Sequence, residues 1–403
     1  MQTIAGLDPS KSNETEQQRI AAAVETIAKN GGGGEIAEAP LKDVNFRDYD
    51  GKIVHSYSSA EFAELTELPA NPSHKGLTAQ GWNWSLEDAQ AYVAKCKRLE
   101  IGQSYVTDDG KTRIYIRVVE NIGFHLGLGV NGTVDVDWGD GTAHDTLTGS
   151  NITTGVQTPL HNYNVGNYVI TLTIDGAAAM LGLFTSDVGR LIVPESYKSC
   201  ITKIELGSNI DFRTATNAQG ALNNCANLET ISIPVEGLFM GSFLYAGCAS
   251  LKYVVLPHNK YTTQLQDNMF AECHSLIGVS MPNTIMFSVG NGYQNYGIFN
   301  GRSLDRIILP DSMQRIGKAT FLNAAVKSIT IPDSITSIET EAFSNISCMA
   351  LHFCGQTPPS VASDGISIGY IESEVKIYVP TGSLSAYTSA NNYPSSRCTY
   401  IEE

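Results

Sequence analysis

The chain has 403 residues and a formal net charge of −15 at pH 7, with a pI near 5.0. This length is enough for two to four domains, and the acidic balance argues against a nucleic-acid-binding protein, which needs a basic patch. The sequence holds no run of about 18 apolar residues, so we expect no membrane span.

The N-terminal segment, residues 1–34, predicts one helix followed by a flexible joint. Ser12 or Asn13 can cap a helix over residues 14–29, because a short polar side chain accepts hydrogen bonds from the first turn. The apolar stripe Ile20, Val24 and Ile27 is too short to stabilise an isolated helix, so we expect it to pack on a partner or on its own copies. Four glycines at 31–34 form the joint. We assign the segment to attachment and oligomerisation, with a trimer as one candidate oligomeric state. Because its first residues are polar, we expect no export signal there.

Residues 35–108 predict a small α/β module. The pair Asp50-Gly51 lies between two short apolar strands and is a hairpin signal. Ser58 and Ser85 each precede a predicted helix and suit the N-cap position.

Two tryptophans, Trp82 and Trp84, allow two interpretations. They are a sugar-stacking platform, or they are core residues of a domain with little apolar volume, and we favour the core. The segments 46–51 and 81–84, with the sequences FRDYDG and GWNW, resemble a module of tail-type proteins from phages and prophages of gut Firmicutes.

Residues 109–178 predict β-structure, with alternating apolar residues from Thr112 and a long strand at 166–174. The motifs at 138–141 (WGDG), 161–163 (HNY) and 166–168 (GNY) resemble the polycystic-kidney-disease (PKD) domain, which implies an immunoglobulin-like sandwich. The resemblance implies that Trp138 is a core residue and that the following glycines form a tight turn.

The same region carries four aspartates that are candidate calcium ligands, because calcium prefers several oxygen ligands. They are Asp135, Asp137, Asp140 and Asp145. Their spacing is not that of an EF-hand loop, so we assign no metal site and no cofactor.

Residues 179–403 predict a solenoid. An alternating hydrophobic triplet followed by proline recurs at 231–234, 254–257, 279–282, 307–310 and 329–332. A period of 22 to 28 residues indicates repeats that bury their apolar faces only against neighbours. Each proline should end its strand, because it has no N–H for the sheet ladder.

Each repeat has further anchors upstream of its strand. These are a leucine or valine, often a cysteine three residues before it, and a phenylalanine earlier still, for which we take Phe243, Phe270, Phe299, Phe321 and Phe343. The pattern resembles the BspA-type leucine-rich repeat, and residues 357–387 resemble the closing cap of that family. An insertion at 283–300 departs from it.

Eight cysteines are present, and none forms a C-x-x-C pair. Cys225, Cys248 and Cys273 recur at one repeat position, where we expect a ladder of buried thiols. Disulfides between neighbouring rungs are the alternative. Synthesis in a cytosol favours reduced thiols.

No catalytic motif is recognisable: the sequence lacks a G-x-S-x-G elbow, a P-loop and an H-E-x-x-H pair. We therefore expect no enzyme activity and name no catalytic residues.

The predicted order is attachment helix, α/β module, immunoglobulin-like spacer and solenoid. It indicates a multidomain, non-enzymatic tail-fibre or receptor-binding protein of a phage or prophage, made in the host cytoplasm and carried in the virion tail. The expected partners are other tail proteins, bound through the N-terminal helix, and a host-surface glycan or protein, bound through the repeats. A bacterial cell-surface adhesin is the alternative, and a tail-tip glycan hydrolase is the third reading.

Ligand binding is expected at the insertion, because insertions in repeats form loops on one face. Tyrosine supplies rigid contact area and asparagine adaptable hydrogen bonding. The candidate binding residues are Tyr293, Gln294, Asn295 and Tyr296, with Tyr245 and Tyr261 in adjacent units.

Overall fold

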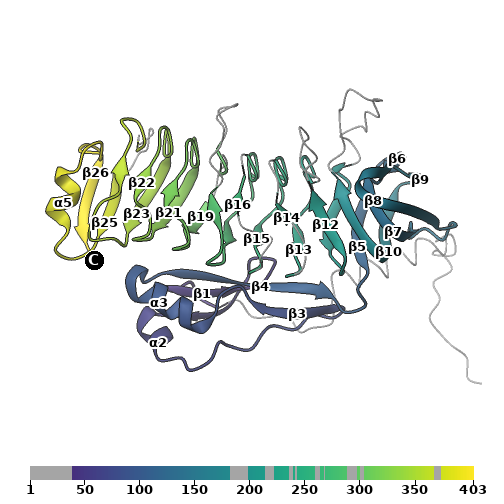
Figure 1. Cartoon of the computed structure of the whole chain (residues 1–403), viewed down its shortest axis with the longest axis horizontal. Helices are drawn as coiled ribbons and strands as arrows, with labels where there is room; N and C mark the ends of the chain where they lie inside the picture. Colours follow the sequence, from purple (N-terminus) through teal and green to yellow (C-terminus); the bar gives the residue numbers. More distant parts are fainter. Residues whose placement is uncertain are drawn as a thin grey trace, which may run out of the picture.

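The computed structural model describes ten segments of the chain: residues 39–181, 198–213, 222–235, 239–240, 243–258, 264–266, 268–287, 297–299, 304–366 and 374–403. The predicted helix at 14–29 and the glycine joint lie outside them. Figure 1 shows an elongated molecule in which stacked rungs form a solenoid, an antiparallel sheet stands at one end, and a small α/β module lies along one side.

The α/β module is a four-stranded mixed sheet with two helices. Its elements are β1 (Val44–Arg47), β2 (Ile53–Tyr57), α2 (Ser59–Ala63), β3 (Leu77–Trp82), α3 (Leu86–Cys96) and β4 (Leu99–Thr107). The strand order is β2-β1-β4-β3, with β1 parallel to β4. The predicted hairpin is confirmed, and Gly51 occupies its left-handed position at φ +89°. Ser58 and Ser85 cap α2 and α3 as predicted.

The next region is β-structure, as predicted, and its strands pair antiparallel. Its strands are β5 (Thr112–Val118), β6 (Ile122–His125), β7 (Leu128–Asp137), β8 (Asp145–Gln157), β9 (Leu160–Tyr163) and β10 (Gly166–Leu181). The main sheet runs β5-β10-β7-β8, and β6 and β9 form a separate ribbon. Trp138 is a core residue at 1% exposure, and the hydroxyl of Tyr163 donates to its carbonyl at 2.7 Å. The immunoglobulin-like assignment stays a prediction.

This sheet continues into the solenoid without a break. β5 pairs with β11 (Ile201–Glu205), and β10 pairs with β12 (Ile210–Arg213). The predicted domain boundary between residues 178 and 179 therefore falls inside β10. The physical reason is that an open sheet edge presents unpaired N–H and C=O groups on which the next strand can form.

The predicted solenoid is confirmed, and the strands of neighbouring rungs pair in parallel. One side carries the longer strands, β13 (Thr230–Ser232), β15 (Tyr253–Val255), β17 (Gly278–Ser280), β19 (Leu304–Ile308), β21 (Ala325–Ile331), β23 (Ser347–Phe353), β25 (Val375–Val379) and β26 (Cys398–Glu402). The other carries the two-residue strands β14 (Phe239–Met240), β16 (Gln264–Leu265), β18 (Met286–Phe287), β20 (Arg315–Ile316), β22 (Ser337–Ile338) and β24 (Ser360–Val361). A short helix, α5 (Leu384–Ser389), lies at the C-terminal end.

Aromatic rings form a continuous stack inside the rungs, with centroids 5.1 to 5.7 Å apart. The members are Tyr245, Phe270, Phe299, Phe321 and Phe343. The first ring is thus Tyr245, and the assignment of Phe243 to this position is wrong. Tyr245 precedes Cys248 by three residues, as Phe270 precedes Cys273, so the offset from the cysteine is constant.

The predicted thiol ladder is confirmed. Cys225, Cys248 and Cys273 are buried and not disulfide-bonded. The thiols of Cys248 and Cys273 donate to carbonyls of the preceding rung, those of Leu222 and Tyr245. Burial raises the pKa of Cys225 and of Cys273 to about 12, so these thiols stay protonated and serve as packing groups.

Candidate binding surfaces

The α/β module covers the side of the solenoid that carries the longer strands. Outward-facing side chains of successive strands are buried beneath it, with Ser232, Ser280 and Thr330 each at 0% exposure. This side is therefore not open to a ligand along those rungs.

The repeat prolines explain why the module fits there. The N–H of Leu309 donates to the carbonyl of Thr330, as in any parallel ladder. The next donor in that ladder belongs to residue 332, which is a proline and has no N–H. The carbonyl of Leu309 is thus left without its ladder partner, and the hydroxyl of Tyr92 on α3 donates to it at 2.7 Å.

In two earlier rungs, the carbonyl that faces a proline also accepts a hydrogen bond from a module side chain. Leu256 faces the strand that ends at Pro282, and its carbonyl accepts from the side-chain amide of Asn83 at 2.9 Å. The carbonyl of Met281 accepts from the indole N–H of Trp84 at 2.8 Å. At each of these three rungs, one module side chain completes a hydrogen bond that proline removes, and a buried carbonyl without such a donor would cost stability.

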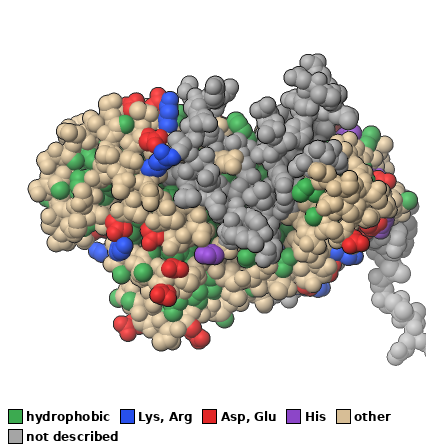
Figure 2. Space-filling view, in the orientation of Figure 1, with side chains coloured by type: hydrophobic (Ala, Val, Ile, Leu, Met, Phe, Trp, Pro, Cys, Tyr) green, Lys and Arg blue, Asp and Glu red, His purple; other side chains and the backbone are tan. Residues whose placement is uncertain are grey.

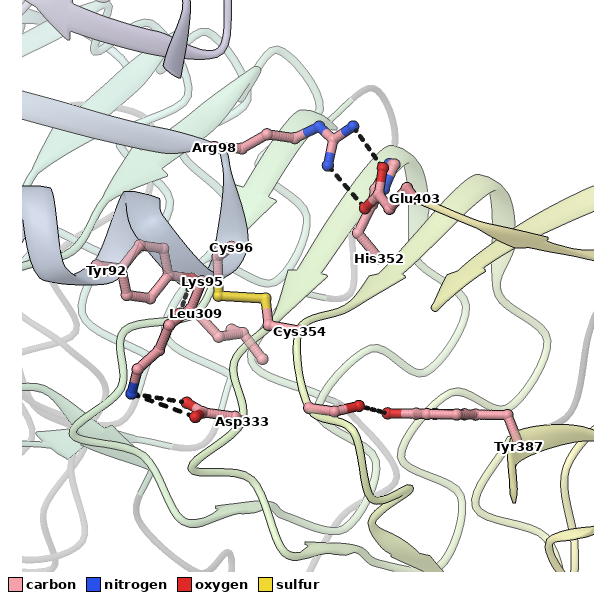
Figure 3. The surroundings of a disulfide bond; sticks show 11 residues. Tyr92, Lys95, Cys96, Arg98, Leu309, Asp333, His352, Cys354, Tyr387 and Glu403 are labelled. Atoms are coloured by element: carbon pink, nitrogen blue, oxygen red, sulfur yellow. Dashed lines mark hydrogen bonds and ion pairs between the residues drawn. A yellow bond between two sulfur atoms is a disulfide. The ribbon is translucent and has the colours of Figure 1, made fainter. Parts of the chain in front are cut away.

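The rung after Pro332 departs from this pattern. Cys354 stands where earlier rungs have proline, and its N–H donates to the carbonyl of Ile331 at 2.9 Å. No module donor is needed there, and the Cys354 sulfur forms a disulfide with Cys96 at the end of α3 (Figure 3). The spacing of the two cysteines in the sequence does not predict this bond. The only signal was the cysteine that replaces proline after Phe353.

A buried ion cluster joins the module to the middle rungs. Glu100, with a side-chain exposure of 4%, forms ion pairs with Arg47 and with Arg306, the latter at 3.1 Å. Burial alone would lower the pKa of Arg47, but the attraction of Glu100 raises it overall. Arg306 also donates to the carbonyl of Lys42 at 3.0 Å. The cluster therefore ties β1, which carries Arg47, and β4, which carries Glu100, to the repeats.

Close backbone approach adds to this interface. A Cβ atom at Gly102 would lie 2.6 Å from a methyl carbon of Val255, which is shorter than van der Waals contact permits. Only glycine at this position of β4 lets the strand lie against β15.

The far end of the module is held by Arg98 and Glu403. Two guanidinium nitrogens of Arg98 donate to the two carboxylate oxygens of Glu403, each at 3.1 Å, and the ring of His352 lies 3.1 Å from the same carboxylate (Figure 3). Burial alone would raise the pKa of Glu403, but the hydrogen bonds with His352 and Arg98 lower it to about 2.

This lowered pKa predicts an acid-sensitive contact. A carboxyl whose pKa falls on folding stabilises the protein above its unfolded pKa of about 4.5 and loses that contribution as the pH drops towards 2. We expect Glu403→Gln to lower the thermal midpoint at pH 7 and to have a much smaller effect at pH 2.5, measured by differential scanning calorimetry. An equal decrease at both pH values would contradict the assignment. Glu339→Gln, at a half-exposed pair with Arg315, is the matched control.

The predicted ligand residues fall into two groups. Tyr245 is fully buried and its ring stacks on Phe270 at 5.4 Å, so it supports the repeats and cannot contact a ligand. Tyr261 and residues 293–296 lie outside the described residues. The predicted core position of Trp84 is confirmed at 3% exposure, while Trp82 is partly exposed and donates to the carbonyl of Pro69.

The four candidate calcium ligands do not converge. Asp135 and Asp137 both face His144, at 3.0 and 3.6 Å, and Asp140 lies 2.8 Å from His161. Asp145 accepts from the indole of Trp138. Within the described ranges, no group of three or more His, Cys, Asp or Glu side chains is placed to hold a metal ion.

A cavity of about 550 Å³ opens where the module meets the repeats. Its lining includes Leu41, Ile53, Ile277, Arg47 and Asp305. Both charged members already have partners, since Arg47 binds Glu100 and Asp305 lies 2.5 Å from Lys327. This arrangement does not indicate a charged ligand.

Figure 2 shows the molecule in the orientation of Figure 1. Charged side chains are scattered over the face in view, with acidic groups along the outer edge of the module. Exposed carboxylates on and beside its helices include Glu64, Glu67 and Glu87. No helix in the described part of the chain is long and apolar enough to span a membrane.

The fold and its rungs define a leucine-rich-repeat solenoid. A family model, the BspA type leucine rich repeat region, matches residues 189–296 and 293–357 in six copies, so this part of the chain is such a region. Among solved structures, a leucine-rich repeat protein from Bacteroides ovatus ATCC 8483 is 16% identical, with 60% of this chain and 80% of that chain covered and a TM-score of 0.22. No curated protein matches the sequence.

Proposed function

We propose that this chain is a non-enzymatic binding protein of the tail-fibre type, which recognises a host-surface glycan or protein through its repeats. The observation that carries the proposal is the docked module. Because the module occupies the side of the solenoid with the longer strands, recognition falls to the opposite side, which carries the two-residue strands. One of these, β18, lies within the insertion at 283–300.

The solenoid interior supports this role. The stacked rings and buried thiols link each rung to the next, and the module spans the rungs from Leu256 to Cys354. A rung array held in this way presents neighbouring loops at fixed spacing, which lowers the entropy lost on binding. The N-terminal segment 1–34 would attach the chain to other tail proteins or to its own copies.

A bacterial cell-surface adhesin is the second candidate, and the Cys96–Cys354 disulfide is compatible with it. Disulfides persist in oxidising surroundings such as the cell exterior. A virion released by lysis reaches the same surroundings, so the bond fits both. Tail and baseplate genes beside this gene would favour the virion, and a secretion context would favour the adhesin.

The insertion is tested by a double substitution. We expect Tyr293→Ala/Tyr296→Ala to reduce binding of the fluorescently labelled full chain to host cells by at least tenfold in apparent Kd, because two tyrosines supply much of the contact area of a binding loop. Flow cytometry over a range of protein concentrations measures this.

The matched control is Val119→Ala/Val165→Ala, which changes two side chains that are 72% and 63% exposed on the antiparallel sheet region. It should bind like the parent. If the tyrosine variant also binds like the parent, the insertion is not the recognition surface.

A further inference from the structure

The disulfide between the module and the solenoid has a feature that the other cysteines lack. It joins residues 258 positions apart, at the end of α3 and after β23. The remaining six cysteines, all described, form no disulfide. The bond is therefore specific to the docked arrangement.

Non-covalent contacts on both sides of this pair hold the two cysteines together. Tyr92 and Lys95 precede Cys96 on α3. Tyr92 donates to the carbonyl of Leu309, and the ammonium of Lys95 lies 3.2 Å from the carboxylate of Asp333. Arg98 follows it and binds Glu403. These contacts do not depend on the oxidation state of sulfur, so they can place the two thiols side by side before any bond forms.

The rung that contains Cys354 fixes the position of this residue. Because Cys354 keeps its N–H in the ladder with Ile331, its backbone is fixed without help from the module. Its side chain is partly exposed, whereas Cys96 is 4% exposed. A reagent from solution thus reaches Cys354 first.

We propose that Cys96 and Cys354 form a thiol–disulfide exchange site that locks the docked module after the chain has folded. The oxidant is an external disulfide, RSSR, either a small molecule or a protein. The Cys354 thiolate attacks RSSR, forming a mixed disulfide and releasing one RSH. The Cys96 thiolate then attacks the Cys354 sulfur and displaces the second RSH. Two protein thiols are oxidised, RSSR is reduced, and the two protons leave on the released thiols.

The other cysteines compete poorly for such a reagent. Cys225, Cys273 and Cys348 are at most 3% exposed, and burial raises the pKa of each to about 12, so little thiolate is present. Cys398 is the exception because it is partly exposed, although its thiol donates to the carbonyl of Pro394. It therefore supplies the control substitution.

This inference goes beyond the proposed function and does not depend on it. It means that the chain folds and docks its module while reduced, and gains its covalent lock on reaching oxidising surroundings. A cross-link that closes so long a loop restricts the unfolded chain strongly.

The test uses the full chain, purified in reductant, desalted and treated with oxidised glutathione. We expect intact mass to show the loss of two hydrogens with no retained glutathione, and peptide mapping to place the bond between Cys96 and Cys354. The thermal midpoint should rise by about 5 °C and return on reduction. Pairing with other cysteines, or no rise, would overturn the proposal.

Two variants and one further measurement complete the test. Cys96→Ser should stop at a glutathione adduct on Cys354, while Cys398→Ser should react like the parent. Hydrogen exchange at the Val235 amide of the solenoid, which donates to the side chain of Gln80 in the module at 2.7 Å, should be slow in both the reduced and the oxidised parent. Fast exchange in the reduced chain alone would show that docking needs the bond, and would contradict a lock that follows folding.

Discussion

Replacing Glu100 by alanine is expected to lower the free energy of unfolding by about 3–5 kcal/mol, because removing one partner of a buried ion cluster leaves the others unpaired. Here the carboxylate is buried and serves two guanidiniums, those of Arg47 and Arg306. Neither arginine has enough exposure to recover full hydration, at 7% and 14% of its side chain. Urea unfolding of the full chain, followed by tryptophan fluorescence, to which Trp82 and Trp84 in the module contribute together with Trp138, measures the loss.

Two variants show whether the cluster or a general charge effect is responsible. Glu100→Gln keeps the shape and one acceptor oxygen, so it should fall between the parent and the alanine variant. Glu229→Ala removes one partner of a pair with Lys252 in which both side chains are more than half exposed. Exposed pairs contribute little, so this variant should unfold almost like the parent. A cost for Glu100→Ala no larger than that for Glu229→Ala would show that the cluster does not hold the module in place.

Local features of the fold could be predicted from the sequence because their causes are local. Alternation over three residues and a terminal proline define each strand of the repeats, as at Ile329 to Pro332. Ser58 and Ser85 predict helix starts for the same reason, since a cap acts within one turn. The thiol ladder followed from one recurring offset.

Docking of the module could not be predicted in this way. The prolines alone imply a row of carbonyls without ladder donors, but nothing local shows that Asn83, Trp84 and Tyr92 supply the missing hydrogens. Those side chains look like core residues of a small module, and Trp84 is one. The disulfide joins two cysteines with no shared motif, and a phenylalanine pattern with a variable offset points to Phe243 and not to Tyr245 as the first ring of the stack. In each case the deciding contact joins segments far apart in the chain.

The docking mechanism makes its own prediction at Tyr92, which is 1% exposed and packs edge-on against Trp84. Tyr92→Ala should lower the free energy of unfolding by about 3–5 kcal/mol through the cavity it leaves. Tyr92→Phe keeps the ring and removes only the donor to Leu309, so it should cost about 1–3 kcal/mol for one buried carbonyl left without a partner. Urea unfolding measures both.

The cause of that cost can be isolated by restoring the ladder. Pro332→Ala returns an N–H at the position from which Cys354 donates in the next rung, so the carbonyl of Leu309 regains a backbone donor. Tyr92→Phe should then cost clearly less in the Pro332→Ala background than in the parent, which a double-mutant cycle measures directly. Tyr163→Phe is the matched control, since its hydroxyl donates to the carbonyl of Trp138, away from any repeat proline. Its cost should be the same in both backgrounds. If the cost of Tyr92→Phe is also unchanged, the repeat proline is not what makes the module's donor necessary.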